Sequence, residues 1–398
     1  MKSQNRPDLY RRDILAGALM LICAAGSLIV ANTSAGESYP HLWSRGLMGH
    51  SLLHWVNDGL MAVFFLLIGL ELKRELLVGE LRTFKGALLP AVAAIGGMVL
   101  PAILYFVINH GQPTEGGFAI PISTDIAFVV GILALLGGRV PTRLKVLLTS
   151  LAVVDDLGAI VVIALCYSGG LQYPYLMMAG LLTVLLLVFN KMFRIDRWWV
   201  YGLGGVVLWW IVMQSGVHSS ITGILLAMAI PFRDGDQEAP AALWERRLHG
   251  PVYFVVLPLF VLANTAIRME GVTFAQLWQP HTAGIAAGLL VGKPLGVVLL
   301  TWGVVKSGWS ELPEGVGWAH IVGGGMLCGI GFTMSILIAS LSFEEAGLVN
   351  TSKLTILLSS TLAAIVGTLL LLIAGREKRG HASSKDRERQ SGEVGECA

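Results

Sequence analysis

Long apolar stretches recur along the chain, and short segments that carry most of the charged residues separate them. A helix needs about 20 mostly apolar residues to cross the hydrocarbon core of a bilayer. We therefore predict an all-α membrane protein with twelve membrane-spanning helices. These spans are Ile14–Ala31, Leu52–Leu72, Ala87–Ile108, Phe118–Leu136, Val146–Tyr167, Tyr175–Asn190, Trp198–Met213, Val217–Phe232, Pro251–Ile267, Thr282–Val304, Val316–Leu341 and Leu354–Ala374.

The positive charges fall almost entirely on one side of this arrangement. If the N-terminus is cytoplasmic, nearly all of the 28 Lys and Arg residues lie in cytoplasmic segments, and the outer side holds only Arg45, Arg268 and Lys353. Cytoplasmic loops of membrane proteins are enriched in Lys and Arg. We therefore expect a single transmembrane domain over residues 1–375 with both termini in the cytoplasm. Residues 376–398 are expected to form a polar, disordered cytoplasmic tail.

The composition agrees with a polytopic membrane protein and excludes other classes. Hydrophobic residues make up 55% of the chain, charged residues make up 14%, and the mean hydropathy is +0.70. Because soluble domains carry about 25% charged residues, a soluble enzyme is excluded. The four cysteines are scattered without a CxxC pair, which indicates neither a zinc site nor a disulfide framework. The net charge of +2 gives no sign of nucleic-acid binding. Since many spans follow, residues 14–31 are interpreted as a retained helix rather than a signal peptide.

Four charged residues lie well within the apolar stretches, namely Asp125, Asp155, Asp156 and Lys293. A charge at the centre of a membrane helix costs about 2.5–3.5 kcal/mol on insertion scales, so such residues are expected to be functional. A buried Asp155–Lys293 pair that only joins two helices is the alternative. Three acids against one lysine leave negative charge over, however, which indicates a site for a cation or for protons. Asp58 lies near the outer end of the second span.

Asp155 and Asp156 are adjacent in the middle of the fifth span. Neighbouring helical residues point about 100° apart, so the two carboxyls are expected to have different roles. One of them can face a cavity while the other faces a partner helix. Like charges in a partly desolvated region repel one another. Protons and a metal cation can therefore compete for this pair.

Two spans contain residues that weaken a helix near its middle. Pro121 and the Ser-Thr-Asp run at 123–125 interrupt the fourth span, and the glycine-rich stretch 323–331 weakens the eleventh. The ends of half-helices carry about half an elementary charge. Asp125 can offset such a charge, and Thr124 can offer an oxygen atom to a cation. A kinked fourth helix with a capping Asp at the surface, and simple close packing of the eleventh helix, stay open as alternatives.

Helices 3–5 and helices 10–12 enter the membrane from opposite sides, as an inverted-topology repeat requires. Each repeat contains one interrupted helix, the fourth and the eleventh. Paired broken helices in inverted repeats mark the transport site of many secondary transporters. The predicted fold is therefore a twelve-helix membrane protein whose two interrupted helices cross at mid-membrane.

Seven stretches spread over most of the chain resemble the NhaA family of bacterial sodium/proton antiporters, which have inverted repeats. They are WVNDGLMAVFFLLIGLELKREL (55–76), PISTDIAFVVGILALLG (121–137), LAVVDDLGAI (151–160), SGVHSSITGILLA (215–227), LPLFVLANT (257–265), GLLVGKPLG (288–296) and GIGFTMSIL (329–337). By this resemblance, Asp156 is the main ligand of sodium or lithium, and Asp155 is a proton carrier paired with Lys293. The resemblance also implies that Asp125 balances helix dipoles at the cation and proton site, and that Thr124 contributes a ligand.

The resemblance further implies residues that set the response to pH. His218 matches a histidine linked to this response, and Asp58 matches an acid of lesser importance. The cytoplasmic cluster tied to pH activation is Glu71, Arg74, Glu75, Glu245 and His249. From the residues alone, this cluster resembles an ordinary charged loop, and His218 resembles a core histidine. Position 246 is Arg where a His is expected, and the segment 32–54 is shorter than in relatives that form dimers through a β-hairpin.

The expected function is electrogenic exchange of sodium or lithium for protons by alternating access, in a multi-pass protein of the bacterial inner membrane. Such a protein is a transporter rather than an enzyme and needs no cofactor. Its expected partners are the transported ions, the bilayer and, as an open possibility, a second copy of the chain. An intramembrane aspartyl protease is disfavoured because the sequence contains no GxGD. A sodium-coupled symporter of organic solutes is the second alternative.

Overall fold

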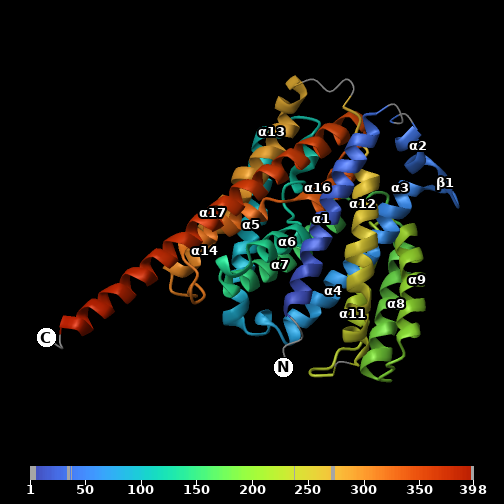
Figure 1. The fold of residues 1–398 in the computed structure, drawn as a ribbon. Helices are drawn as coiled ribbons and strands as arrows, with labels where there is room; N and C mark the ends of the chain where they lie inside the picture. The colour runs from blue at the N-terminus through green and yellow to red at the C-terminus, as the bar shows by residue number, and fades with distance from the viewer. Residues whose placement is uncertain (1–5, 34–35, 37, 237, 270–273, 396–398) are drawn as a thin grey trace.

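The structure is a computed structural model that describes all but a few short segments of the chain. The described residues are 6–33, 36, 38–236, 238–269 and 274–395. Figure 1 shows a bundle of α-helices, and the sheet in the described part is one short hairpin of β1 (Gly46–Leu47) and β2 (His50–Ser51). The prediction of an all-α membrane protein is confirmed.

Every predicted span falls on helical structure. Eight helices in the described ranges are long and apolar enough to cross a membrane, and one bent helix pair makes a ninth. The spans formed by one uninterrupted helix are α1 (Arg6–Ala31), α5 (Phe84–Asn109), α7 (Thr142–Cys166), α8 (Tyr173–Lys191), α9 (Trp198–Gln214), α10 (Ile221–Ala229) and α17 (Ala346–Gly395).

The eighth predicted span differs most from the structure. Its helix, α10, covers Ile221–Ala229 rather than the whole stretch from Val217 to Phe232. Gly216 adopts a left-handed conformation before it, with φ of 80°, and Pro231 follows it. Because proline disfavours a helical residue before it, the helix ends early.

Three spans contain a π-helical turn between two α-helical segments. They are α3 (Leu52–His54), η1 (Trp55–Leu60) and α4 (Met61–Leu77); α11 (Pro240–Pro251), η5 (Val252–Val256) and α12 (Leu257–Asn264); and α13 (Pro280–Ala287), η7 (Gly288–Gly292) and α14 (Lys293–Lys306). Such turns are frequent at functional sites. Two of the ionisable residues that the sequence singles out lie at these turns, since Asp58 is within η1 and Lys293 directly follows η7.

Both predicted interruptions are present. The fourth span consists of η3 (Glu115–Ala119), a non-helical segment over 120–125, and α6 (Ile126–Leu136). The eleventh consists of α15 (Trp318–Cys328) and α16 (Phe332–Ser342), which meet at an angle of 44°. The remaining short elements are α2 (Ser38–Ser44), η2 (Glu80–Arg82), η4 (Gly137–Arg139) and η6 (Phe274–Trp278).

The third and tenth spans, which begin the two repeats, pack directly against each other through small residues of α5 and α14. A side chain at Gly96 of α5 would collide with the backbone carbonyl of Gly296 on α14, and a side chain at Gly296 would collide with the carbonyl of Gly96. Small residues at helix interfaces in membranes allow this close approach. The reciprocal contact is what two equivalent helices related by a pseudo-two-fold axis produce.

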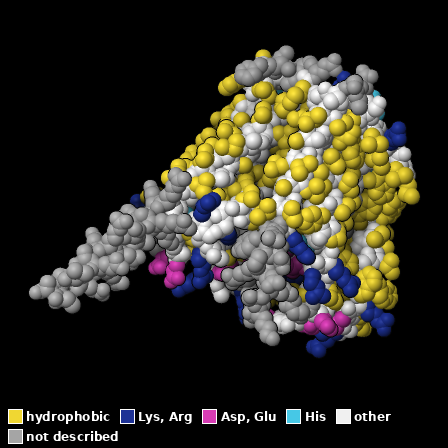
Figure 2. All heavy atoms as spheres, in the orientation of Figure 1, with side chains coloured by type: hydrophobic (Ala, Val, Ile, Leu, Met, Phe, Trp, Pro, Cys, Tyr) yellow, Lys and Arg dark blue, Asp and Glu magenta, His cyan; other side chains and the backbone are white. Residues whose placement is uncertain are grey.

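Figure 2 shows apolar side chains over the middle of the molecule and Lys and Arg side chains gathered at the end where Figure 1 places the N-terminus. We call this end, which holds the connections α4–α5, α6–α7 and α8–α9, the basic end. The other end, which carries the hairpin, is called the opposite end. The helix α17 continues through the polar segment after Arg376 as far as Gly395.

Candidate functional site

The site is built around the non-helical segment of the fourth span. Asp125 lies at the N-terminal cap of α6, where its Oδ1 accepts a hydrogen bond from the backbone N–H of Phe128 at 3.3 Å. A carboxylate at this position satisfies a free N–H group and offsets the positive end of the helix dipole. Asp125 is 3% exposed, so this cap is buried inside the bundle.

The same carboxylate also caps the second interrupted helix. Asp125 Oδ2 accepts hydrogen bonds from the hydroxyl of Thr333 at 2.5 Å and from its backbone N–H at 3.1 Å, at the start of α16. The backbone N–H of Asp125 donates to the carbonyl of Ile330 at 2.7 Å. The hydroxyl of Thr124 donates to the carbonyl of Cys328 at the end of α15, at 2.9 Å. The two interruptions therefore lie against each other, and one acid faces the positive ends of two half-helices.

Asp155 and Asp156 lie on α7 beside this crossing, and both are almost completely buried. Asp155 Oδ2 forms an ion pair with Lys293 Nζ at 2.6 Å. Lys293, also fully buried, donates a second hydrogen bond to the carbonyl of Ile122 in the non-helical segment. Asp156 Oδ1 instead accepts a hydrogen bond from the hydroxyl of Ser123 at 3.0 Å. The two adjacent acids thus have different partners, as their angular separation requires.

One carboxylate oxygen of each aspartate takes no part in the contacts with Lys293 and Ser123. Asp155 Oδ1 and Asp156 Oδ2 are buried and have no hydrogen-bond partner within the described part of the chain. An unpartnered buried oxygen is unfavourable, because it loses its hydration without replacement. A proton or a hard cation such as sodium, which prefers oxygen ligands, would restore an interaction at each atom. This arrangement can hold either species.

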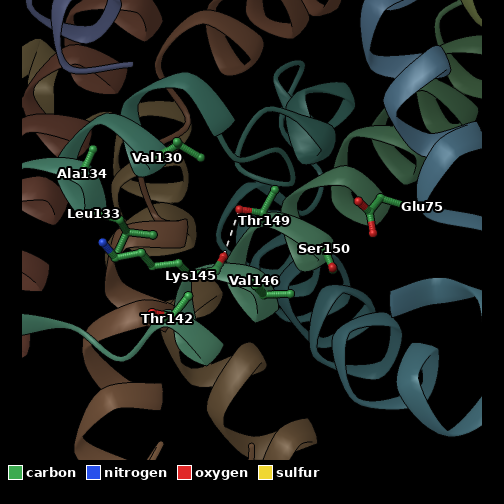
Figure 3. Close-up of a pocket in the computed structure, with 9 residues that line it drawn as sticks. All are labelled: Glu75, Val130, Leu133, Ala134, Thr142, Lys145, Val146, Thr149 and Ser150. Carbon is green, nitrogen blue, oxygen red and sulfur yellow. Dashed lines mark hydrogen bonds between the residues drawn. The ribbon is translucent and has the colours of Figure 1, made fainter. Parts of the chain in front are cut away.

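A cavity of about 270 Å³ is lined by residues of α4, α6 and α7 (Figure 3). Its polar lining comprises Glu75 of α4 and four residues of α7, namely Thr142, Lys145, Thr149 and Ser150. Ser150 lies five residues before Asp155, which is about 7.5 Å along an α-helix. The cavity therefore lies along α7 on the basic-end side of the aspartate pair, and neither aspartate lines it.

The cytoplasmic residues that the family resemblance ties to pH response are partly brought together. Arg74 of α4 forms ion pairs with Glu245 of α11 and, at 3.5 Å, with its neighbour Glu75. Glu71 lies one turn before Glu75 on α4. His249, one turn after Glu245, has its ring 4.5 Å from that of Tyr253, measured between centroids. These residues connect α4 with α11 at the basic end.

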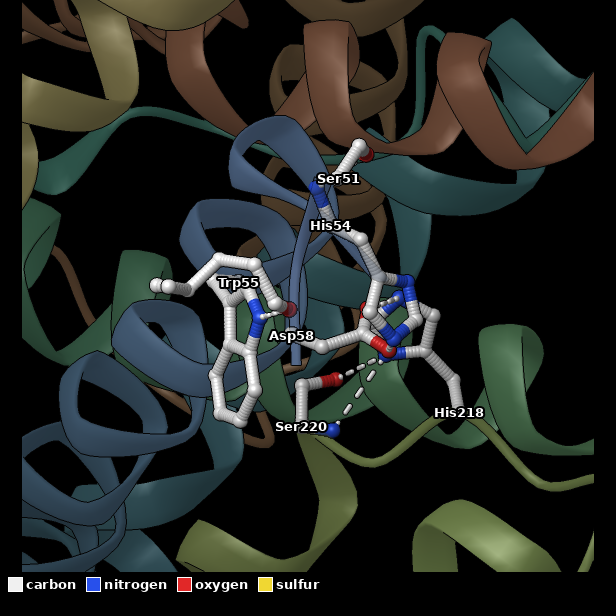
Figure 4. A network of polar contacts seen from close by, with 7 residues as sticks. Ser51, His54, Trp55, Asp58, His218 and Ser220 are labelled. Atoms are coloured by element: carbon white, nitrogen blue, oxygen red, sulfur yellow. Dashed lines mark hydrogen bonds and ion pairs between the residues drawn. The ribbon is translucent and has the colours of Figure 1, made fainter. Parts of the chain in front are cut away.

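His218 lies in a separate network at the opposite end (Figure 4). Its Nε2 is 3.4 Å from Asp58 Oδ1, and its Nδ1 lies 2.7 Å from the hydroxyl of Ser220. His54 Nε2 is 3.4 Å from the other oxygen of Asp58, so two imidazoles face one carboxylate. The ring of His50 stacks on that of His54. Neither Asp58 nor His218 belongs to the set of contacts around Asp155.

Several residues of these sites escape sequence reasoning. Ser123 lies in the predicted polar run, yet nothing in the sequence pairs it with Asp156. His54 precedes Asp58 by four residues, a spacing that places two side chains on one helix face and could have revealed it. Lys73 donates to three carbonyls at the end of α10, of which Met228 is 2.8 Å away, and no local signal distinguishes it from its charged neighbours.

Two interrupted helices that meet at buried ionisable residues are typical of secondary transporters built from inverted repeats. Residues 8–371 match the family model described as Na+/H+ antiporter 1. The chain is 48% identical to the Na(+)/H(+) antiporter NhaA of Dechloromonas aromatica over 93% of this chain and 96% of that protein. It is 46% identical to the NhaA of Cytophaga hutchinsonii over 94% and 97%, and 44% identical to that of Vibrio cholerae over 92% and 97%. The chain belongs to the NhaA family of Na+/H+ antiporters, which are transporters and not enzymes.

Proposed function

We propose that this protein exchanges sodium or lithium for protons at Asp155 and Asp156. The observation that carries the proposal is the pair of buried, unpartnered oxygens, Asp155 Oδ1 and Asp156 Oδ2, beside the crossing. Asp156 is the main cation ligand, because its carboxylate forms no ion pair with the described residues and accepts a hydrogen bond from the hydroxyl of Ser123. Thr124 and the carbonyls of the non-helical segment supply the further oxygen ligands in this proposal. Asp125 keeps the two half-helix N-termini neutralised while the cation binds and leaves.

Lys293 couples proton binding to cation binding in this proposal. In the structure its ammonium group neutralises Asp155. When Asp155 accepts a proton, the ion pair is lost, and when a cation approaches, its positive charge competes with Lys293 for the same carboxylate. Protons and sodium therefore exclude each other at the pair. Alternating access then exposes the two aspartates to the two sides of the membrane in turn.

The exchange is proposed to be electrogenic. The family resemblance implies about two protons inward for each sodium outward, so that one net charge moves inward per cycle and the membrane potential contributes about 2.3 kcal/mol per 100 mV. The positive-inside rule supports a cytoplasmic location for the basic end. With that orientation, residues 1–375 form one transmembrane domain of the bacterial inner membrane, and residues 376–398 are cytoplasmic. The exposed strands β1 and β2 offer an edge through which two copies can dimerise.

Sodium-driven proton movement in everted membrane vesicles tests this function. Vesicles are acidified by respiration, and a fluorescent ΔpH dye is followed while NaCl is added between about pH 6.5 and 9, a range over which protons and sodium compete. Dye fluorescence is expected to recover on addition of NaCl or LiCl and not of choline chloride. Failure of NaCl at every pH, with the protein present in the membrane, would contradict the proposal. Sodium-dependent uptake of an organic solute without proton movement would favour a symporter.

The charge cluster at the basic end is proposed to set the pH at which exchange becomes active. Glu245→Gln removes a negative charge beside Arg74, which makes proton release from nearby groups easier. The midpoint of the pH profile is therefore expected to move toward acidic pH by about half a unit, since this cluster is partly exposed and screened. Arg74→Gln is expected to move it in the opposite direction. The vesicle measurement at each pH gives both midpoints.

The matched control is Glu238→Gln, which removes an exposed acid close to α11 in the sequence. Its profile is expected to coincide with that of the unaltered protein. Shifts of the same sign for Glu245→Gln and Arg74→Gln would show that charge at this cluster does not set the midpoint.

A further inference from the structure

A buried lysine lies at the opposite end of the bundle, away from the aspartate pair. Lys353 belongs to α17 and is only 7% exposed, although the sequence assigns it to an outer loop. Its Nζ donates a hydrogen bond to Asn264 Oδ1 at 3.3 Å, and it forms no ion pair with the described residues. Charged side chains within membrane segments are unfavourable unless they have a function or a partner. An ammonium group held only by an amide oxygen therefore needs an explanation beyond packing.

The contact of Lys353 is the first link of a polar chain across three spans. Asn264, the last residue of α12, donates through Nδ2 to Asn57 Oδ1 of η1 at 2.7 Å. The same Nδ2 lies 3.1 Å from the carbonyl of Phe260 one turn earlier, which fixes the orientation of the amide. The side chain of Asn264 thus accepts from one helix and donates to another. Removing Lys353 takes away the donor to Asn264 Oδ1, and removing Asn57 leaves Nδ2 with the carbonyl of Phe260 on its own helix.

These hydrogen bonds join two different groups of helices. The helix α17 packs on α13, α15 and α16, which belong to the repeat that contains the second interruption. The elements α12 and η1 pack on each other and on α1 and α4, respectively, and α12 also contacts α16. The links from Lys353 to Asn264 and from Asn264 to Asn57 therefore hold these groups together at the opposite end. The cavity beside α7, by contrast, lies on the basic-end side of the aspartate pair and extends along α7 as far as Ser150.

We propose that Lys353, Asn264 and Asn57 form a latch that closes the opposite end while the aspartate pair is accessible from the basic end. The inference rests on the alternating access of the proposed function. Hydrogen bonds to a charged group are stronger than those between neutral groups, so Lys353 is the link whose loss weakens the latch most. Opening of this end separates α17 from α12 and breaks the hydrogen bond between Lys353 and Asn264. Lys353 is a positioning residue in this scheme and does not bind the transported cation.

Chemical labelling of a buried cysteine tests the latch without requiring transport. Thr265, next to Asn264, is fully buried and is replaced by cysteine in a chain whose own Cys23, Cys166, Cys328 and Cys397 are changed to serine. A membrane-impermeant maleimide is added from the outside to intact cells, and the rate of modification is measured. Lys353→Met is expected to raise this rate at least about fivefold, the size of effect that loss of one charge-assisted hydrogen bond produces.

A second latch variant and a control show whether a change in labelling comes from the latch. Asn57→Ala removes the hydrogen bond between Asn264 and Asn57. It is expected to raise the labelling rate as Lys353→Met does, and it tests the latch even if the Lys353→Met protein fails to reach the membrane. Lys306→Met removes a lysine at the basic end of α14 and is expected to leave the rate unchanged. Unchanged labelling in both latch variants overturns the proposal. If the latch variants label faster but NaCl never releases protons in the unaltered protein, the proposed function fails and the latch stands.

Discussion

Asp156→Asn is expected to abolish the recovery of dye fluorescence that NaCl produces in everted vesicles. The substitution keeps the shape of the side chain, and its amide oxygen can still accept the hydrogen bond from Ser123. It removes the negative charge and the group that takes up a proton. Loss of one partner from a buried charge interaction costs about 2–5 kcal/mol. Since each 1.4 kcal/mol is about a tenfold change in an equilibrium constant, sodium affinity falls by at least about thirtyfold.

The control for this experiment is Asp234→Asn, which changes an exposed acid in the connection between α10 and α11. It is expected to give the same response to NaCl as the unaltered protein. The amount of each protein in the membrane is compared by immunoblot, and its elution in detergent shows whether it is folded. Full exchange by a folded Asp156→Asn protein would contradict the assignment of Asp156 as the main cation ligand.

The helices and their interruptions could be predicted from the sequence because the bilayer leaves little choice. Backbone polar groups in hydrocarbon must be satisfied within the protein, so long apolar stretches form helices. For the same reason, the backbone groups of the polar run at 123–125 are expected to contact other parts of the protein rather than lipid. The exact helix ends are less predictable, as α10 shows, because its length depends on the local turn at Gly216 and on Pro231.

The contacts that make the site could not be predicted in the same way. Asp125 and Thr333 are 208 residues apart in the chain, and only the packing of two repeats brings them within 2.5 Å. A charge pattern shows that Asp125 needs a partner, but it does not show which one. Lys353 illustrates the opposite error, since a single lysine near the end of a span looks like a loop residue. Its burial follows from the packing of α17 on α13, α15 and α16, which no local pattern encodes.

The ion pair of Asp155 and Lys293 allows a second strong test, this time of stability. Lys293→Met is expected to destabilise the protein, because it leaves the buried carboxylate of Asp155 without its counter-charge and removes the donor to the carbonyl of Ile122. Breaking a buried pair by removing one partner costs about 3–5 kcal/mol, whereas replacing both partners is often neutral. Asp155→Asn combined with Lys293→Met is therefore expected to recover most of the lost stability. The stability of each variant is measured by heating it in detergent and determining how much protein still elutes in the folded form.

The double variant separates the structural role of the pair from its transport role. Lys293→Arg keeps the positive charge, so it is expected to retain much of the stability and to weaken exchange without abolishing it. The double variant is expected to be stable but unable to couple protons to sodium, because the group that competes with the cation and the group that accepts the proton are both gone. A pair that serves only as helix glue would leave exchange intact once stability is restored. Stability without exchange is the result that a proton-coupled site requires.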